Sequence, residues 1–259
     1  MKNPRFLFPA IVAAATLITT SAGHDSAKEL PSHAEVQAAL KNVVTGGGNA
    51  GFGLNMWATI VNRDGEVTTV AFSGNDRGDQ WPGSRVISAQ KANTANSFSL
   101  PGLALSTANI YSATQPGGSL YGLQHSNPVD TGAAYKGPSE NYGKANDPLV
   151  GKKIGGVNVF GGGLALYNAA GKLVGALGVS GYTSCTDHII AWKIRHALNL
   201  DNVPAGVSPT GDDNMVHDIA PDANGHPKSA SGWGHPICDA AEGAVVAALP
   251  ATHPVSANP

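Results

Sequence analysis

The sequence predicts an α+β fold in which helices pack on one antiparallel sheet. Two segments, 58–74 and 164–181, share the order strand, Asn-x-x-Gly turn, strand and Ser-Gly. Each is followed by a polar loop and then by a segment whose apolar residues recur at helical spacing. Two hairpins are too few for a solenoid, but they suit a single sheet covered by helices. A chain of 259 residues, 42% of them hydrophobic, is long enough to bury such a core.

The first 23 residues have the pattern of a secretory signal peptide. Lys2 and Arg5 form a basic start, residues 6–18 form an apolar stretch, and residues 21–23 are small residues suited to cleavage. The apolar stretch is too short to span a bilayer comfortably. We therefore expect cleavage near Gly23, a periplasmic or secreted mature protein, and no transmembrane segment in it. An uncleaved anchor is the alternative.

The first half of the mature chain predicts a helix, a hairpin and a second helix. Ser32 and Glu35 have the spacing of a capping box, and the glycines at 46–48 end the helix that follows. The hairpin pairs strands 56–62 and 67–72. The second helix is expected from Ser84, as its cap, to Ser97, with small residues against the sheet.

The second half predicts a long loop, the other hairpin, a helix and a tail. Residues 117–150 form the loop, and strands 164–167 and 173–179 lead to a helix over 187–198. Glycines inside the last strand, Gly175 and Gly178, indicate close approach of another backbone or a ligand. We expect one domain over 24–200, with 201–259 as an irregular extension packed on it and a short helix at 242–249.

Charge and cysteine content restrict the functional classes. Charged residues make up only 13% of the chain and the formal net charge is −2, which excludes an electrostatic nucleic-acid binder. Two cysteines in an exported chain, Cys185 and Cys238, are best interpreted as one disulfide between the loop after Gly181 and the tail. A metal site or a reactive thiol is the alternative, which no C-x-x-C spacing supports.

Several residues around the two loop–helix junctions are candidates for ligand binding. Ser180 and Gly181 end a strand before a helix, where free amide groups gather, so they suit the floor of a pocket; tight helix packing is the other interpretation. Arg85 stands near a helix start and suits an anionic ligand, or else an ion pair within its loop. Lys91 lies in mid-helix and marks a site if its face is buried.

Histidines are the candidates for coordinating a metal or haem iron. His188 follows Asp187, which can orient an imidazole, and His125 lies in the long loop. The tail contains four more histidines. For these, as for any single histidine, a polar surface residue is the alternative interpretation.

Four features follow one another along segments 62–95 and 155–198: V-x-R-D-G at 61–65, Asp79, S-A-x-K-A-x-T-A at 88–95 and G-x-L-x-G-x-x-G-V-S-G at 171–181. Together these segments resemble the GlcG/HbpS family of haem-binding proteins, often labelled haem-degrading. The resemblance implies a profilin-like antiparallel sheet flanked by helices, haem as ligand, and often a homo-oligomer. The long loop and the tail look like additions to the family domain.

Three hypotheses follow. The first is an exported protein that binds a small ligand, haem or a related tetrapyrrole, with Arg85 or Lys91 meeting its carboxylates and His188 or His125 as axial ligand. The second is an enzyme acting on a small carbonyl or aromatic compound, with Lys91 and Asp187 as acid–base groups. The third is a structural oligomer with the long loop as a subunit contact.

Overall fold

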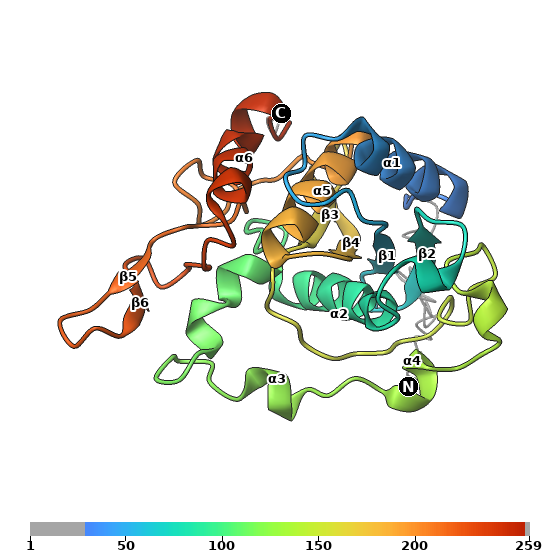
Figure 1. The fold of residues 1–259 in the computed structure, drawn as a ribbon, viewed down its shortest axis with the longest axis horizontal. Helices are drawn as coiled ribbons and strands as arrows, with labels where there is room; N and C mark the ends of the chain where they lie inside the picture. The colour runs from blue at the N-terminus through green and yellow to red at the C-terminus, as the bar shows by residue number, and fades with distance from the viewer. Residues whose placement is uncertain (1–28, 257–259) are drawn as a thin grey trace, which may run out of the picture.

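A computed structural model describes residues 29–256, and the predicted signal peptide lies outside them. One four-stranded antiparallel sheet has the order β2-β1-β4-β3. Helices α1 and α5 cover one face of it and α2 covers the other (Figure 1). The predicted α+β fold is confirmed. Its strands are β1 (Trp57–Asn62), β2 (Val67–Phe72), β3 (Gly163–Tyr167) and β4 (Leu173–Ser180).

The three sheet-covering helices begin at caps that only partly match the expected ones. In α1 (His33–Gly46), the predicted capping box is present, with the Ser32 amide donating to the Glu35 carboxylate at 2.7 Å. The expected cap at Ser84 is wrong, because α2 (Gly83–Phe98) starts earlier and buries Ser84 in its first turn. Likewise α5 (Ser184–Ala197) starts three residues before Asp187, capped by the Thr183 hydroxyl.

Helix α2 lies unusually close to the sheet, as the glycines of the second hairpin predicted. Gly163 and Gly178 are paired across β3 and β4 directly beneath it. A Cβ atom at Gly178 would collide with the Ser88 carbonyl group, and one at Gly163 with the backbone of Lys91. The Ser88 hydroxyl also lies 2.7 Å from that of Thr59 on β1. The two glycines therefore set the depth at which α2 packs.

Between α2 and β3 the chain contains only short elements, and it passes beneath α2 in Figure 1. The predicted loop 117–150 is held by Arg85, whose guanidinium forms a two-point ion pair with Asp147 and stacks 3.6 Å from the Tyr142 ring centroid. The short elements of this region and of the preceding loop are η2 (Arg77–Asp79), η3 (Thr107–Ile110), η4 (Ser112–Thr114), α3 (Leu123–Ser126), α4 (Thr131–Ala134) and η5 (Ser139–Asn141).

The tail is more ordered than expected. The predicted short helix at 242–249 is part of a longer helix, α6 (Ala240–Thr252), which Asp239 caps and which packs on α5. A small hairpin of β5 (Ile219–Pro221) and β6 (Pro227–Ser229) projects from the body (Figure 1). No helix among residues 29–256 is long and apolar enough to cross a membrane.

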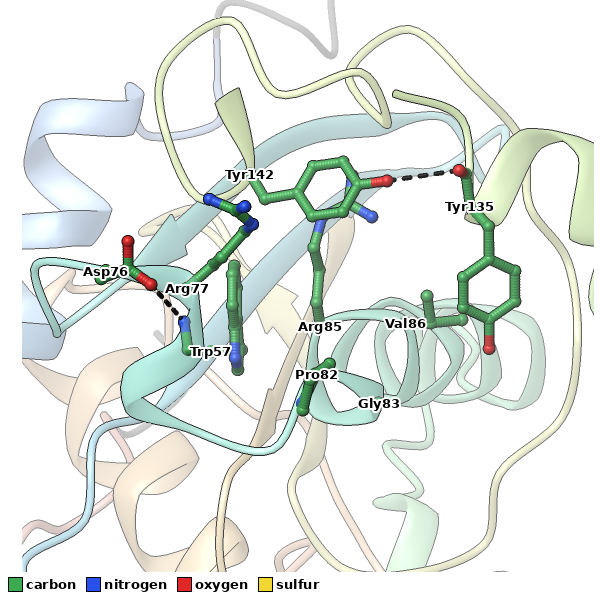
Figure 2. A pocket seen from close by; sticks show the side chains of 10 residues that line it. Trp57, Asp76, Arg77, Pro82, Gly83, Arg85, Val86, Tyr135 and Tyr142 are labelled. Carbon is green, nitrogen blue, oxygen red and sulfur yellow. Dashed lines mark hydrogen bonds between the residues drawn. The ribbon is translucent and has the colours of Figure 1, made fainter. Parts of the chain in front are cut away.

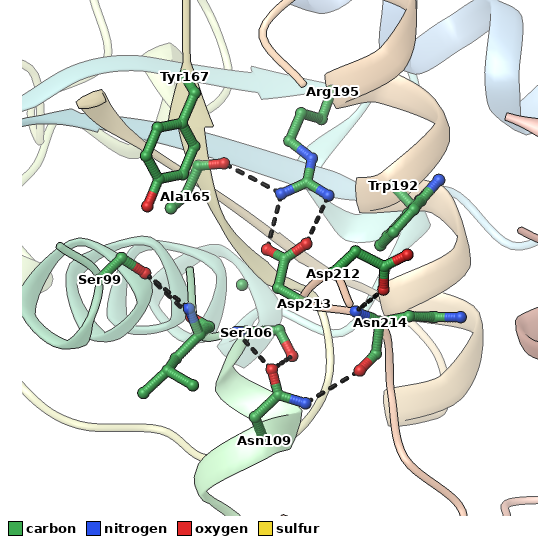
Figure 3. Close-up of polar contacts among 12 residues, drawn as sticks. Ser99, Ser106, Asn109, Ala165, Tyr167, Trp192, Arg195, Asp212, Asp213 and Asn214 are labelled. Atoms are coloured by element: carbon green, nitrogen blue, oxygen red, sulfur yellow. Dashed lines mark hydrogen bonds and ion pairs between the residues drawn. The ribbon is translucent and has the colours of Figure 1, made fainter. Parts of the chain in front are cut away.

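Two connections fix the tail to α5. Arg195 and Asp213 form a buried two-point ion pair with N–O distances of 2.7 and 2.8 Å (Figure 3). The predicted disulfide between Cys185 and Cys238 is formed, with 6.1 Å between the Cα atoms. The extension is thus an integral part of the folded body.

Candidate functional site

Lys91 and Asp187, the two predicted acid–base residues, meet between the helices α2 and α5. The Lys91 ammonium donates to an Asp187 oxygen at 2.6 Å and to the Val179 carbonyl at 3.1 Å. Both side chains are almost completely buried. Lys91 is therefore buried and paired, as expected of a lysine that marks a site.

The Asp187 carboxylate also organises the loop after β4. Its other oxygen accepts a hydrogen bond from the Tyr182 amide at 2.9 Å. Burial raises the pKa of the Asp187 carboxyl to about 6, against the opposing effect of the Lys91 ammonium. The pair joins two helices with the end of β4.

Ser180 and Gly181, the predicted pocket floor, are covered by neighbouring residues. The Gly181 carbonyl accepts a hydrogen bond from the Gln80 side chain at 2.8 Å, and a Cβ at Gly181 would strike Met56. Neither of the two cavities described below is lined by Ser180, Gly181, Lys91 or Asp187. The glycine here permits close packing of Met56, Asn55 and Gln80 around the loop.

His188 is buried in the second turn of α5. Its Nε2 lies 3.2 Å from the Asn214 amide oxygen, which also accepts from the Met215 amide. This places the proton on Nε2, and Nδ1 is buried without a partner among residues 29–256. Burial, assisted by the Arg195 charge, lowers the pKa of His188 to about 3.

Arg85 borders a cavity of about 330 Å³ at the start of α2 (Figure 2). The Arg85 charge is neutralised by Asp147. The other cation that lines this cavity, Arg77, is exposed and has no ion-pair partner among the described residues. The Trp57 indole N–H is buried there and has no acceptor in the same part of the chain. Within residues 29–256, Arg77 is thus the free cation of a cavity whose walls include Trp57, Tyr135 and Tyr142.

His125 borders a second cavity, of about 340 Å³, formed by the long loop and the segments 111–116 and 159–160. The rings of Tyr111 and Phe160 line it with their centroids 6.5 Å apart. Tyr121 and Phe160 are 63% and 46% exposed, so the cavity opens to solvent through aromatic side chains. The His125 ring is exposed and makes no hydrogen bond within residues 29–256, so both ring nitrogens are available to a ligand.

Of the predicted site residues, the structure therefore unites Lys91, Asp187, Ser180 and Gly181, and separates Arg85 and His125 into two cavities. His188 lines neither cavity. Sequence reasoning missed Tyr111 and Phe160, which stand in segments without periodicity. Aromatic residues in the segments that flank a histidine-containing loop were the available signal.

Comparison with known proteins identifies the central part of the chain. A family model described as "Haem degrading protein HbpS-like" matches residues 24–195. A crystal structure of the Klebsiella pneumoniae protein ORFY, a DUF336 protein, is similar, with 24% identity, a TM-score of 0.44, and coverage of 65% of this chain and 90% of that chain. A crystal structure of a PduOC:heme complex is similar at 23% identity and a TM-score of 0.45, covering 64% and 91% of the two chains. No curated protein matches.

Proposed function

Because the chain belongs to the HbpS-like family of haem-degrading proteins, we propose that it binds haem or a related tetrapyrrole in the cavity beside His125. The observation that supports this most directly is the free imidazole of His125 in a cavity walled by Tyr111 and Phe160. Histidine is a common axial ligand of haem iron, and flat aromatic rings pack well against a macrocycle.

The residues around His125 fit such a ligand in size and chemistry. A cavity of about 340 Å³ lies within the range of small-molecule sites, and its open side leaves room for the rest of a large planar ligand. The Thr107 hydroxyl hydrogen-bonds to the Phe160 carbonyl and so fixes the backbone that presents the Phe160 ring. Gln115 and Gln124 offer amide groups at the rim for polar substituents.

Titration of the purified protein with hemin tests this proposal. We expect a Soret band shift with the wild type and its loss in His125→Ala, because the axial nitrogen is removed. His188→Ala, at the other predicted axial residue, is expected to keep the shift, since His188 borders neither cavity. His226→Ala, a change at an exposed tail histidine, is the matched control. An unchanged shift in His125→Ala would contradict the proposed site.

The cavity beside Arg77 is the competing location. Its exposed Arg77 guanidinium suits a carboxylate, such as a propionate group. If Arg77→Ala abolished the hemin response while His125→Ala preserved it, the ligand would belong to this cavity.

A second candidate function is acid–base catalysis on a small carbonyl or aromatic compound. One observation favours it, the buried Lys91–Asp187 pair with the pKa of Asp187 raised to about 6. A screen for turnover of such compounds, followed by Lys91→Met, tests it. Full activity in a folded Lys91→Met variant would exclude this mechanism.

Export and self-association belong to the same proposal. The basic and apolar pattern of residues 1–23 supports export to the periplasm or cell exterior. The family resemblance supports a homo-oligomer. Native mass spectrometry of protein from its own host measures both, because the mass of the subunit reports cleavage near Gly23.

A further inference from the structure

The tail brings two histidines beside the Cys185–Cys238 disulfide. The Cys185 sulfur and one ring nitrogen each of His217 and His235 lie within 4.8 Å of one another. Cys185 is in the first turn of α5, whereas both histidines and Cys238 come from the tail. The set therefore lies mostly outside the segment 24–195 that matches the family.

Both histidines have a buried nitrogen without a partner. The Nε2 atoms of His217 and His235 make no hydrogen bond to any of residues 29–256. His235 is only 2% exposed, and its Nδ1 donates to the Pro236 carbonyl at 2.8 Å. That bond places the proton on Nδ1 and leaves the lone pair on Nε2, the arrangement of a metal-binding histidine. An unsatisfied buried polar group costs about 1–3 kcal/mol, which calls for a ligand or another explanation.

The surroundings of the disulfide favour the thiolate form of Cys238. Its sulfur lies 3.2 Å from the Cys185 amide and 3.5 Å from the Ser184 hydroxyl, at the start of the 14-residue helix α5. Donors and the positive end of a helix stabilise a thiolate. Cys238 is also exposed, so an external thiol can reach its sulfur. The oxidised pair is thus accessible to reduction.

We propose that reduction of the Cys185–Cys238 disulfide opens a Zn²⁺ site at Cys185, His217 and His235, and that Cys238, which groups with Cys185 but not with the two histidines while the disulfide is intact, turns in as the fourth ligand. A dithiol reductant supplies two electrons and two protons, the S–S bond breaks to two thiols, and the dithiol becomes a disulfide. The two thiols then release their protons as Zn²⁺ binds. Two thiolates and two neutral imidazoles form a common structural zinc set with no net charge. The disulfide prevents binding because each sulfur is occupied by the other.

Metal titration of the full chain under oxidised and reduced conditions tests the proposal. We expect the protein reduced with a phosphine to bind one equivalent of Zn²⁺, and the oxidised protein to bind far more weakly. Co²⁺ in place of Zn²⁺ should give the visible bands of tetrahedral coordination and a thiolate charge-transfer band. His235→Ala and Cys238→Ser should each weaken Zn²⁺ binding by at least the order of 10–100-fold seen for residues that only support metal ligands.

His226→Ala removes a tail histidine outside the cluster and should bind Zn²⁺ like the wild type. Equal binding by His226→Ala and His235→Ala would overturn the proposal, as would equal binding by the oxidised and reduced forms. If reduction unfolds the chain, recovery of the far-ultraviolet circular dichroism on adding Zn²⁺ supports the site, and failure to recover refutes it. These readouts are independent of the Soret band, so this result and that for haem are separable.

Discussion

The two hairpin–Ser-Gly–helix units have the same local construction. In the first turn, the Asn62 side-chain oxygen accepts from the amides of Asp64 and Glu66, each at 3.0 Å. In the second, the Asn168 oxygen accepts from Ala170 and Lys172, again at 3.0 Å. In both hairpins, β1–β2 and β3–β4, the pairing register of the strands shifts just before the asparagine. Both turns end on a glycine with positive φ. The same four-residue pattern gives the same turn in both units.

The units differ in the face of the sheet that each uses. Phe72, which precedes the first Ser-Gly, packs with α2, whereas Val179, which precedes the second, packs with α1 and α5. Because successive side chains of a strand point to opposite faces, the residues before the two Ser-Gly pairs point to opposite faces of the sheet. The helix that follows each pair covers one of these faces. Helices α2 and α5 therefore enclose the sheet, and the Lys91–Asp187 ion pair links them.

Each helix also anchors one of the two long irregular segments, the loop 117–150 and the tail after residue 200. Arg85 of α2 holds the long loop through Asp147, and Arg195 of α5 holds the tail through Asp213. Both arginines stack on an aromatic ring, at 3.6 Å for Tyr142 and 4.8 Å for Trp192. The same local chemistry therefore supports two different surroundings, one with the proposed haem cavity and one with the proposed zinc site.

Removal of the anchoring arginines should have the largest effect. Arg85→Met and Arg195→Met each leave a buried carboxylate unpaired, so we expect the free energy of unfolding to fall by about 3–5 kcal/mol. Urea denaturation followed by circular dichroism measures the loss, with the exposed Arg77→Met as control. Limited proteolysis should then cut the long loop first in Arg85→Met and the tail first in Arg195→Met. Identical cleavage patterns would contradict separate anchoring.

The close approach of α2 to the second hairpin should be the next most sensitive feature. Gly178→Ala places a methyl group against the Ser88 carbonyl, and we expect a loss of about 1–3 kcal/mol from overpacking. Gly46→Ala, at the end of α1 where no atom lies within 4 Å, is the matched control and should be neutral or stabilising. Equal stability of the two variants would show that α2 can move away freely.

Acid should destabilise the protein through the buried histidines around the second unit. The pKa values of His188 and His235 are lowered to about 3 and about 4, chiefly by burial, so between these values and pH ~6.5 the unfolded chain binds more protons. Stability therefore falls as pH drops, by about 1.4 kcal/mol per pH unit for each histidine. The pKa of Asp187 is raised to about 6, so between pH ~4 and ~6 the folded protein binds the extra proton at this group. Its contribution to stability rises as pH drops and cancels the loss from one histidine.

Urea denaturation across pH 4 to 7 measures this slope, a range set by the ordinary and lowered histidine values of about 6.5 and 4. His188→Asn should flatten it, whereas His226→Asn, at an exposed position, should leave it unchanged. A slope unaffected by His188→Asn would mean that this imidazole is protonated in the folded protein.

Substitution of the turn asparagines, Asn62 and Asn168, should change the free energy of unfolding least. Asn62→Ala and Asn168→Ala each remove two side-chain to backbone hydrogen bonds, and we expect losses of about 1 kcal/mol in each case. Thermal or urea denaturation measures both. A much larger loss for one of them would show that the units are alike in geometry but not in energy.

Local features were predictable because their interactions span only a few residues. The capping box at Ser32, the strands beside the Asn-x-x-Gly turns, and the close packing at Gly178 all follow from short patterns. The cap at Ser84 was mispredicted because the helix starts on Pro82 and Gly83, without any side-chain cap. Helix α6 was predicted too short because the prolines and glycines around it conceal its Asp239 cap.

The two hairpins, the α+β class, the disulfide between the two cysteines and the family resemblance were all predictable from the amino-acid sequence. The face of the sheet that each helix covers and the charges that meet depend on tertiary packing. Arg85 and Asp147 are 62 residues apart, Lys91 and Asp187 are 96 apart, and no local pattern encodes such pairs. Tertiary packing also leaves His125 exposed beside Tyr111 and Phe160, without a hydrogen bond among residues 29–256, and buries His188. Burial depends on how distant segments pack, so the sequence pattern could not rank the two histidines.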